Sequence, residues 1–194
     1  MMGDGNGDGI KDSEQNSVTS ITFLQTPTAQ SNPGDAPVTP ISLVADSLTG
    51  KSDPDPGTAV VTKLEQQDAP ADMPAELTMP LGLLSFTVNL QANAGSGPVA
   101  ETFSLYVDPS IGANGYWVQN ADGIWCNLAS AAYGGQMVLE GGKLRLDFQL
   151  VDGGEFDTDG LVNGNVSNVG AAANMPLSLV GYAPTSPTTG DFFF

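Results

Sequence analysis

The N-terminal stretch carries oxygen-bearing side chains at alternating positions. Asp4, Asn6 and Asp8 are separated by single glycines, and Asp12 follows four positions later. Oxygen ligands at this spacing, with a glycine that permits a sharp turn and a backbone carbonyl between them, wrap a hard cation of the size of Ca²⁺. We therefore predict a calcium site with side-chain ligands from these four residues and a backbone carbonyl ligand from Ile10.

This loop departs from an EF-hand at its twelfth position. An EF-hand has a bidentate glutamate there, whereas this chain has Gln15, and no helical pattern precedes the loop. Glu14 is a substitute in the wrong register. The alternative to a calcium site is a flexible acidic leader.

A second acidic cluster directly follows the clearest strand pattern. Its oxygen donors are Asp152, Glu155, Asp157, Asp159 and Asn163. The four carboxylates repel one another when nothing neutralises them, and a bound cation would order the loop. We predict a second calcium site here, with Asp108 as an additional ligand from the end of another strand. The alternative is a solvated acidic turn.

Four aromatic residues fall close together in the sequence: Tyr116, Trp117, Trp125 and Tyr133. In short strands of a sandwich, such side chains more often pack inward than face a ligand. We expect most of them to belong to the core, and one or two to line a ligand pocket near the second acidic loop.

The composition limits the classes of function. With 22 acidic and 5 basic residues the net charge is -17, so nucleic acid and anionic membranes are poor partners. The absence of histidine and the single cysteine, Cys126, exclude imidazole or thiolate metal sites and histidine-based catalysis. We expect Cys126 to be a small core residue. No apolar run is long enough to span a bilayer.

Paired carboxylates also occur in glycosidases, where one acid needs an apolar pocket that raises its pKa. Here the acids lie in glycine-rich loops. We therefore predict a binding protein and no enzyme.

The elements that must position these loops are strands. Nine segments have strand character: 18–24, 38–45, 58–64, 83–91, 101–107, 115–119, 123–128, 136–140 and 143–151. The clearest alternation of apolar and polar residues is in 143–151, which indicates one buried and one wet face. Glu140-Gly141-Gly142-Lys143 predicts a two-residue hairpin. The fold expected is an all-β antiparallel sandwich with long calcium-binding loops.

The expected organisation is one domain. Residues 1–17 form a calcium-binding leader packed on the domain, 18–183 form the ligand-binding sandwich, and 184–194 form a tail. Two proline-rich stretches, 46–57 and 66–80, are expected to be long surface loops. We expect the chain to be a monomeric module of a longer secreted polypeptide, with its secretion signal elsewhere.

Four segments together resemble a known family. They are the acidic leader running into DSEQNSVTS, MPLGLLSFTV at 79–88, GANGYW at 112–117 and LVDGGEFDTDGLVNG at 150–164. They look like the calcium-dependent peptide-binding domains near the distal tip of long bacterial repeats-in-toxin (RTX) adhesins, and like the related choice-of-anchor U surface domains. The resemblance covers most of residues 4–182.

The resemblance implies a β-sandwich that holds several calcium ions, one of which takes the C-terminal carboxylate of a partner peptide. That ion would be held by Asp157, Asp159 and Asn163, with Asp108. The module would be extracellular, on the bacterial cell surface, and would act in cell adhesion and biofilm formation by binding a peptide or protein C-terminus on a host or neighbouring cell.

Two other functions remain open at this point. One is a structural spacer that calcium only makes rigid. The other is a calcium-dependent lectin that binds a glycan through vicinal sugar hydroxyls.

Overall fold

The structure, a computed structural model, describes residues 3–26, 37–48, 51–52, 59–90 and 97–176. The predicted tail at 184–194 lies outside these residues. The strands are β1 (Val18–Leu24), β2 (Val38–Ala45), β3 (Ser47–Leu48), β4 (Lys51–Ser52), β5 (Val60–Gln67), β6 (Leu83–Asn89), β7 (Ala100–Val107), β8 (Gly115–Gln119), β9 (Trp125–Asn127), β10 (Gln136–Glu140), β11 (Lys143–Val151) and β12 (Asn165–Ala173). Short 3-10 helices are η1 (Asp12–Glu14), η2 (Pro109–Ile111) and η3 (Ala131–Tyr133).

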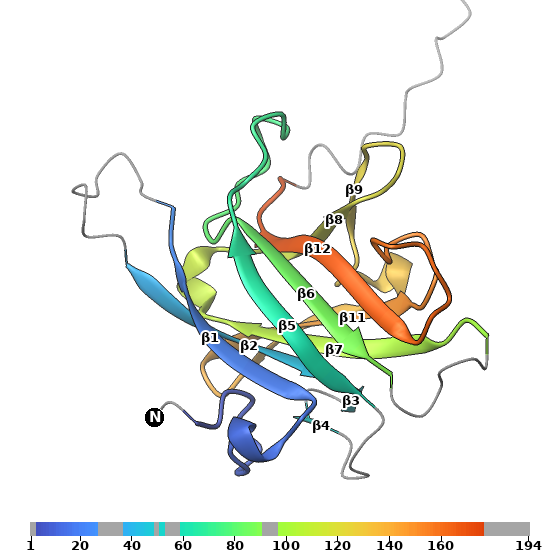
Figure 1. Cartoon of the computed structure of the whole chain (residues 1–194). Coiled ribbons are helices and arrows are strands. Elements are labelled where there is room, and N and C mark those ends of the chain that lie inside the picture. Colours follow the sequence, from blue (N-terminus) through green and yellow to red (C-terminus); the bar gives the residue numbers. More distant parts are fainter. Residues whose placement is uncertain (1–2, 27–36, 49–50, 53–58, 91–96, 177–194) are drawn as a thin grey trace, which may run out of the picture.

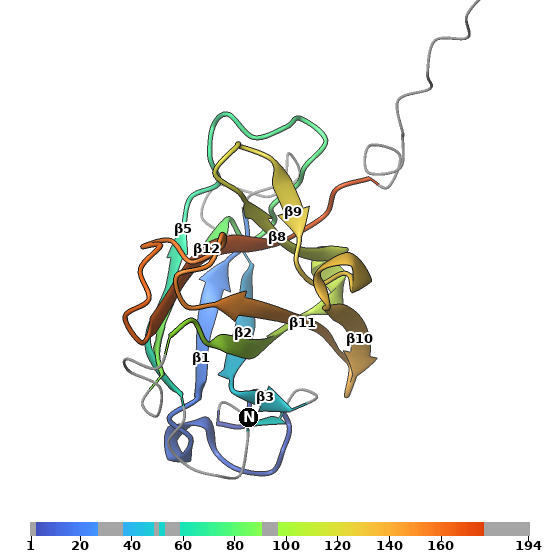
Figure 2. The same ribbon diagram turned by 90° about the vertical axis from the view of Figure 1, so that its right-hand side faces the viewer.

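Two five-stranded antiparallel sheets make up the domain. The first sheet has the order β1-β2-β7-β11-β10, and the second has the order β5-β6-β12-β8-β9. In Figure 1, β5, β6 and β12 lie in front of β7 and β11, and Figure 2 shows β8 and β12 stacked over β11. The all-β antiparallel sandwich predicted from the sequence is confirmed.

The core fills the space between the two sheets, as the alternation along the strands predicts. Leu146, Phe148 and Leu150 of β11 are each at most 3% exposed. The Phe148 ring stacks on Tyr116 of the opposite sheet, with ring centroids 4.1 Å apart. Stacked aromatic pairs of this kind hold the two sheets in one register.

The predicted hairpin at 140–143 is confirmed. Glu140 of β10 pairs with Lys143 of β11, and the two glycines between them have φ angles of 57° and 80°. Both angles lie in the left-handed region, which glycine adopts without a steric penalty.

The segment after β5 is only in part the surface loop that its prolines indicate, because residues 71–72 and 74–76 are exposed but Leu77 and Met79 are buried. The expected loop at 66–80 begins inside β5, and Leu77 and Met79 farther along are 1% and 4% exposed. They pack with Trp117 in a second apolar cluster. This packing covers the part of the outer face of the second sheet around Trp117, Ala171 and Ala173. In the other expected loop, 46–57, Ser47–Leu48 and Lys51–Ser52 pair as the hairpin β3–β4, and most of the remainder lies outside the described residues.

Strand β12 has no counterpart in the sequence prediction. Its sequence, NVSNVGAAA, is poor in the β-branched and aromatic residues that favour strands. Nevertheless β12 is the central strand of the second sheet. A Cβ atom on Gly170 would lie 2.8 Å from the Tyr116 ring. Small residues therefore form this strand because larger ones lie against it on both faces.

Candidate functional site

The N-terminal loop, residues 3–15, lies at the lower end of β1 in Figure 1 (dark blue). Through Gly5 it contacts Ser20 and Ser42 on the face of the first sheet that points away from the core. A Cβ atom on Gly5 would lie 1.9 Å from Ser42 Oγ and 2.2 Å from Ser20 Oγ. The Lys143 ammonium donates a hydrogen bond to the Gly5 carbonyl oxygen. Glycine at position 5 therefore allows the loop to approach the sheet closely.

The carboxylates of this loop organise its backbone. Asp4 accepts hydrogen bonds from the backbone N–H groups of Asp8, at 3.0 Å, and of Gly9, at 3.1 Å. Asp12 accepts one from the Gly5 N–H at 2.8 Å. Gly9 has a φ of +88°, which allows the sharp turn that the sequence predicts at this position.

Two side-chain amides meet at one carboxylate oxygen in this loop. The NH₂ groups of Asn6 and Gln15 both donate to Asp8 Oδ2, at 3.0 and 2.6 Å. Their carbonyl oxygens, Asn6 Oδ1 and Gln15 Oε1, are buried and have no hydrogen-bond partner among the described residues. A buried acceptor without a partner costs about 1–3 kcal/mol. The loop thus holds two oxygens that lack a positive partner.

Gln15 is a residue that the sequence interpretation did not include among the ligands. It occupies the twelfth position of the loop, where an EF-hand has its glutamate. The signal was its spacing from Asp4, because the amide oxygen can serve where a carboxylate is absent.

The charge of Asp8 suits a cation. Burial raises its pKa, but the hydrogen bonds from Gln15, the Ile10 N–H and Asn6 outweigh burial, and the pKa is lowered on balance. In the described part of the chain, no three acidic, cysteine or histidine side chains are grouped closely enough to hold a metal ion. A cation in this loop would therefore depend on the amide oxygens as well as on the carboxylates.

The second acidic loop, residues 152–164, uses its carboxylates differently. Asp152 is 1% exposed. Its Oδ1 accepts a hydrogen bond from the Asn163 N–H at 3.1 Å, and its Oδ2 accepts one from the Gly164 N–H at 2.9 Å. Asp152 therefore ties the end of the loop to its beginning.

Asp157 has a similar role. Its two oxygens accept hydrogen bonds from the N–H groups of Gly153, at 2.8 Å, and Ser167, at 2.9 Å. Burial raises the pKa of Asp157, and the charges of Asp159 and Asp152 add to that effect. The two buried acids of this loop thus have backbone donors on both oxygens.

The other predicted ligands of this loop are exposed. Asp159 accepts hydrogen bonds from the Leu161 N–H at 2.8 Å and from the Asn163 amide at 3.0 Å. Glu155 accepts one from Asn120 at 3.1 Å. These side chains share the loop, but two of the predicted ligands are turned inward and three outward.

Asp108 lies at the opposite end of β7 from this loop. It follows Val107, which pairs with Leu144, whereas the loop follows Val151, which pairs with Ala100. At about 3.3 Å per residue the two ends are about 23 Å apart. Asp108 caps η2 by accepting from the Ser110 N–H at 2.8 Å, and hydrogen bonds from Ser110 lower its pKa. The structure therefore does not bring Asp108 to Asp157, Asp159 and Asn163.

The four candidate aromatic residues separate. Tyr116 is fully buried between the sheets, and Trp117 is buried on the opposite face of the same strand. Trp125 packs partly buried beside Trp117. Tyr133 is 43% exposed and contacts Phe156 of the second loop edge-on, with ring centroids 5.9 Å apart. Cys126 is buried in the main core, as predicted.

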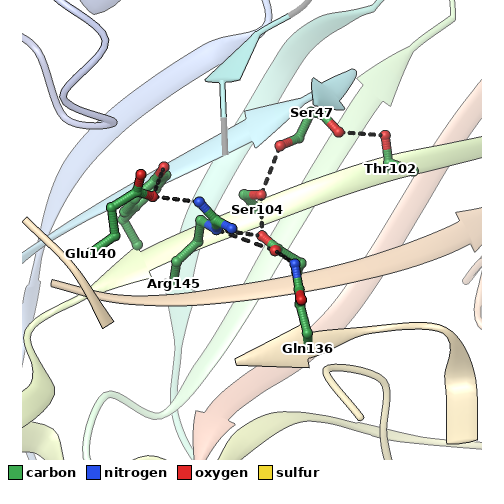
Figure 3. Close-up of polar contacts among 8 residues, drawn as sticks. Ser47, Thr102, Ser104, Gln136, Glu140 and Arg145 are labelled. Carbon is green, nitrogen blue, oxygen red and sulfur yellow. Dashed lines mark hydrogen bonds and ion pairs between the residues drawn. The ribbon is translucent and has the colours of Figure 1, made fainter. Parts of the chain in front are cut away.

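A buried charged network lies on the outer face of the first sheet, where the sequence predicts only a wet surface (Figure 3). The Arg145 side chain is 7% exposed and forms ion pairs with Glu140 and Asp147. Its Nε lies 3.0 Å from Asp147 Oδ1. Tyr106 packs beside it, and burial raises the pKa of Tyr106 to about 12.

Hydroxyl groups extend this network from Asp147. Ser104 donates to Asp147 at 2.5 Å, and the Ser47 and Ser104 hydroxyls lie 2.7 Å apart. Thr102 donates to the Ser47 carbonyl oxygen at 3.0 Å, and Gln136 donates to Asp147 at 2.8 Å. The signal in the sequence was the pair of opposite charges two positions apart on the polar face of 143–151.

These groups border a surface hollow of about 200 Å³. It lies over β7 and β11, with Ser47 on one side and Gly134 and Gln136 on the other. The described residues include no helix with the length and apolar character needed to cross a membrane.

The fold and these features define an all-β sandwich domain with an acidic N-terminal loop docked on one sheet. Comparison with known proteins gives no match to a family model, to a curated protein or to a solved structure.

Proposed function

We propose that the chain is a calcium-dependent binding module of an extracellular bacterial surface protein, and that its N-terminal loop holds a calcium ion. The observation that carries the proposal is the pair of buried amide oxygens of Asn6 and Gln15. Both amides donate to Asp8, and neither of their oxygens has a hydrogen-bond partner among the described residues. Asn and Gln carbonyl oxygens are among the ligands that Ca²⁺ takes.

The donor set of the loop fits calcium in number and kind. One oxygen each from Asp4, Asn6, Asp8, Ile10, Asp12 and Gln15 would give six ligands, within the range of about 6–8 that calcium takes. The ligands are carboxylates, amides and one backbone carbonyl, with no nitrogen or sulfur. The net charge of -17 also favours a divalent cation over an anion.

Calcium in this loop would stabilise the sandwich as a whole. The loop contacts the first sheet through Gly5, and Lys143 of β11 donates to the Gly5 carbonyl oxygen. Val18, Val44 and Tyr106 form a small buried cluster on this outer face. An ion that orders the loop would therefore also support β1, β2 and β7, the strands that carry these three residues.

The partner in this proposal is a peptide with a free C-terminal carboxylate, as the resemblance implies. The exposed Glu155, Asp159 and Asn163 stand at the surface of the second loop, where a second, incompletely coordinated calcium could accept that carboxylate. Because the protein is so acidic, an anionic peptide would be repelled without the metal.

The first experiment is a calorimetric titration of Ca²⁺ into metal-free protein, paired with thermal unfolding in calcium and in EDTA. We expect binding, and a gain of about 2.7 kcal/mol in unfolding free energy at a calcium concentration of about 100 times Kd. Asp8→Asn should abolish the N-terminal site. The matched control, Asp159→Asn in the other acidic loop, should keep it. No binding heat and no thermal shift in the unaltered protein would contradict the proposal.

A screen of short peptides with free and amidated C-termini, in calcium and in EDTA, tests the partner. Hits should need both calcium and the free carboxylate. A blank screen together with a full thermal response to calcium would instead favour a calcium-stiffened spacer.

A further inference from the structure

We propose that the hollow on the outer face of the first sheet is a second binding site, which takes a neutral polyhydroxylated ligand such as one sugar unit of a glycan. It is separate from the calcium loop, and it contacts the ligand through side chains without a metal. The inference stands on the shape, the chemistry and the rigidity of the hollow.

The hollow is large enough for a small molecule. Its volume is about 200 Å³, whereas one water occupies about 30 Å³ of liquid. Its floor contains two directly paired positions of β7 and β11, Thr102 with Gln149 and Ser104 with Asp147. Concave sites with a few convergent polar groups are the usual places for small ligands.

The groups that line the hollow suit hydroxyl groups. Thr102, Gln136 and Gln149 are exposed at this site and carry one hydroxyl and two carboxamides. Hydroxyls and carboxamides each donate and accept hydrogen bonds, as sugar hydroxyls do. Thr102 donates its own proton to the Ser47 carbonyl oxygen, so its hydroxyl oxygen is oriented to accept a bond from a ligand.

The charge in the hollow is already balanced. Among the described residues that line it, Asp147 is the only acid, and it pairs with Arg145. Both Asp147 oxygens also accept hydrogen bonds, one from Ser104 and one from Gln136. A cationic ligand therefore meets a carboxylate that is already engaged, and the net charge of -17 disfavours an anion. A neutral ligand is what remains.

The supporting groups are rigid before any ligand binds. Ser104 and Arg145 are 1% and 6% exposed, and the network in Figure 3 fixes Ser47, Ser104 and Asp147 relative to one another. Polar groups held in place in this way bind without a large loss of side-chain entropy.

The test is a ¹⁵N–¹H NMR titration with free neutral monosaccharides (glucose, galactose, mannose, fucose and N-acetylglucosamine) and with anionic sialic acid. We expect one or more neutral sugars to shift backbone amides in 102–104, 134–136 and 147–149, and sialic acid to bind more weakly. Thr102→Val should weaken binding by about tenfold, the order of one hydrogen bond.

Thr62→Val is the matched control, because Thr62 is also an exposed strand threonine whose hydroxyl donates to a backbone carbonyl, that of Thr87 at 3.1 Å. It should leave binding unchanged. Binding should persist in EDTA and in Asp8→Asn, at a temperature where both remain folded, so failure of the calcium proposal is distinguishable. The inference is overturned when no neutral sugar shifts these amides, when Thr102→Val binds like Thr62→Val, or when sugar binding disappears in EDTA while the fold persists.

Discussion

The two acidic loops look alike in sequence and differ in how they use their oxygens. Both are glycine-rich and carry three or more acids within a dozen residues. In loop 152–164, Asp152 and Asp157 have backbone N–H donors on both oxygens. In loop 3–15, the oxygens of Asn6 and Gln15 are buried without a partner among the described residues. The buried acids of loop 152–164 are thus satisfied by the backbone, whereas two buried oxygens of loop 3–15 have no donor among the described residues.

The number of acidic residues in a loop is therefore a poor guide to where oxygens are available for a cation. The second loop has four carboxylates, but its two buried acids accept hydrogen bonds from backbone N–H groups of the loop itself. In the first loop the informative atoms belong to neutral amides. An amide oxygen that is buried without a donor marks the position where a cation would be favourable.

The largest loss of stability is expected at Asp152, and it tests whether the second loop is held together by its own hydrogen bonds. Asp152→Ala leaves the buried N–H group of Gly164 and the partly buried N–H group of Asn163 without an acceptor. We expect a loss of about 3–4 kcal/mol in unfolding free energy, from about 2–3 kcal/mol for the Gly164 donor and about 1 kcal/mol for the Asn163 donor. The loss should be the same in calcium and in EDTA, measured by urea unfolding. The exposed Asp159→Ala should change stability by less than about 0.5 kcal/mol. A loss at Asp152 that appears only in calcium would show that this buried acid is itself a metal ligand, in addition to the exposed side chains of the loop.

A pH experiment extends the comparison to Glu101, a third acid that accepts backbone N–H bonds, from Asp46 and Thr102. Burial, together with the charge of Asp46, raises its pKa from 4.5 to about 7. Because the folded state binds this proton more tightly than the unfolded chain, the stabilisation is complete below about pH 4.5 and is lost as the pH rises through 7.

This shift corresponds to on the order of 3 kcal/mol. Glu101→Gln keeps the acceptor and removes the titration. The difference in unfolding free energy between the two proteins should therefore grow in favour of Glu101→Gln from about pH 4.5 to about pH 7 and stay level above that. Parallel pH profiles for the two proteins would disprove the assignment.

A smaller effect tests the docking of the first loop. Gly5→Ala puts a methyl group 1.9 Å from Ser42 Oγ, which the packed sheet cannot accept without a shift. We expect a loss of about 2 kcal/mol, observed as a lower midpoint of urea unfolding and as weaker calcium binding. Gly7→Ala is a control for a methyl group without a clash, because nothing lies within 4 Å of its Cβ position. Its φ of +71° adds a backbone penalty of about 1 kcal/mol, so its loss should be smaller than that of Gly5→Ala. Equal losses for both substitutions would argue against close docking.

The smallest expected effect concerns the twelfth position of the first loop. Gln15→Glu replaces an amide oxygen by a carboxylate and should tighten calcium binding by about tenfold, or about 1.4 kcal/mol. Gln15→Ala should weaken it. Calorimetry measures both, and unchanged affinity in the two variants would remove Gln15 from the site.

Much of the sandwich could be predicted from local sequence patterns. Apolar and polar residues alternate from Lys143 to Leu150, and the structure buries Leu146, Phe148 and Leu150 on the predicted face. The Gly-Gly turn at 141–142 is equally local, because left-handed backbone favours glycine. Strand β12 could not be predicted in this way. Most of its residues are small, and it is a strand because it pairs with β6 and β8.

For the candidate sites, the oxygen-bearing residues and their spacing could be predicted from the sequence alone, because spacing within one loop is a local property. Only the tertiary structure decided which of those oxygens are already satisfied and which segments meet. The register of β7 against β11 separates Asp108 from the second loop, and the same register brings Ser104 to Asp147. The physical reason is that hydrogen-bond partners and strand register depend on contacts between residues far apart in the chain, which periodicity does not encode.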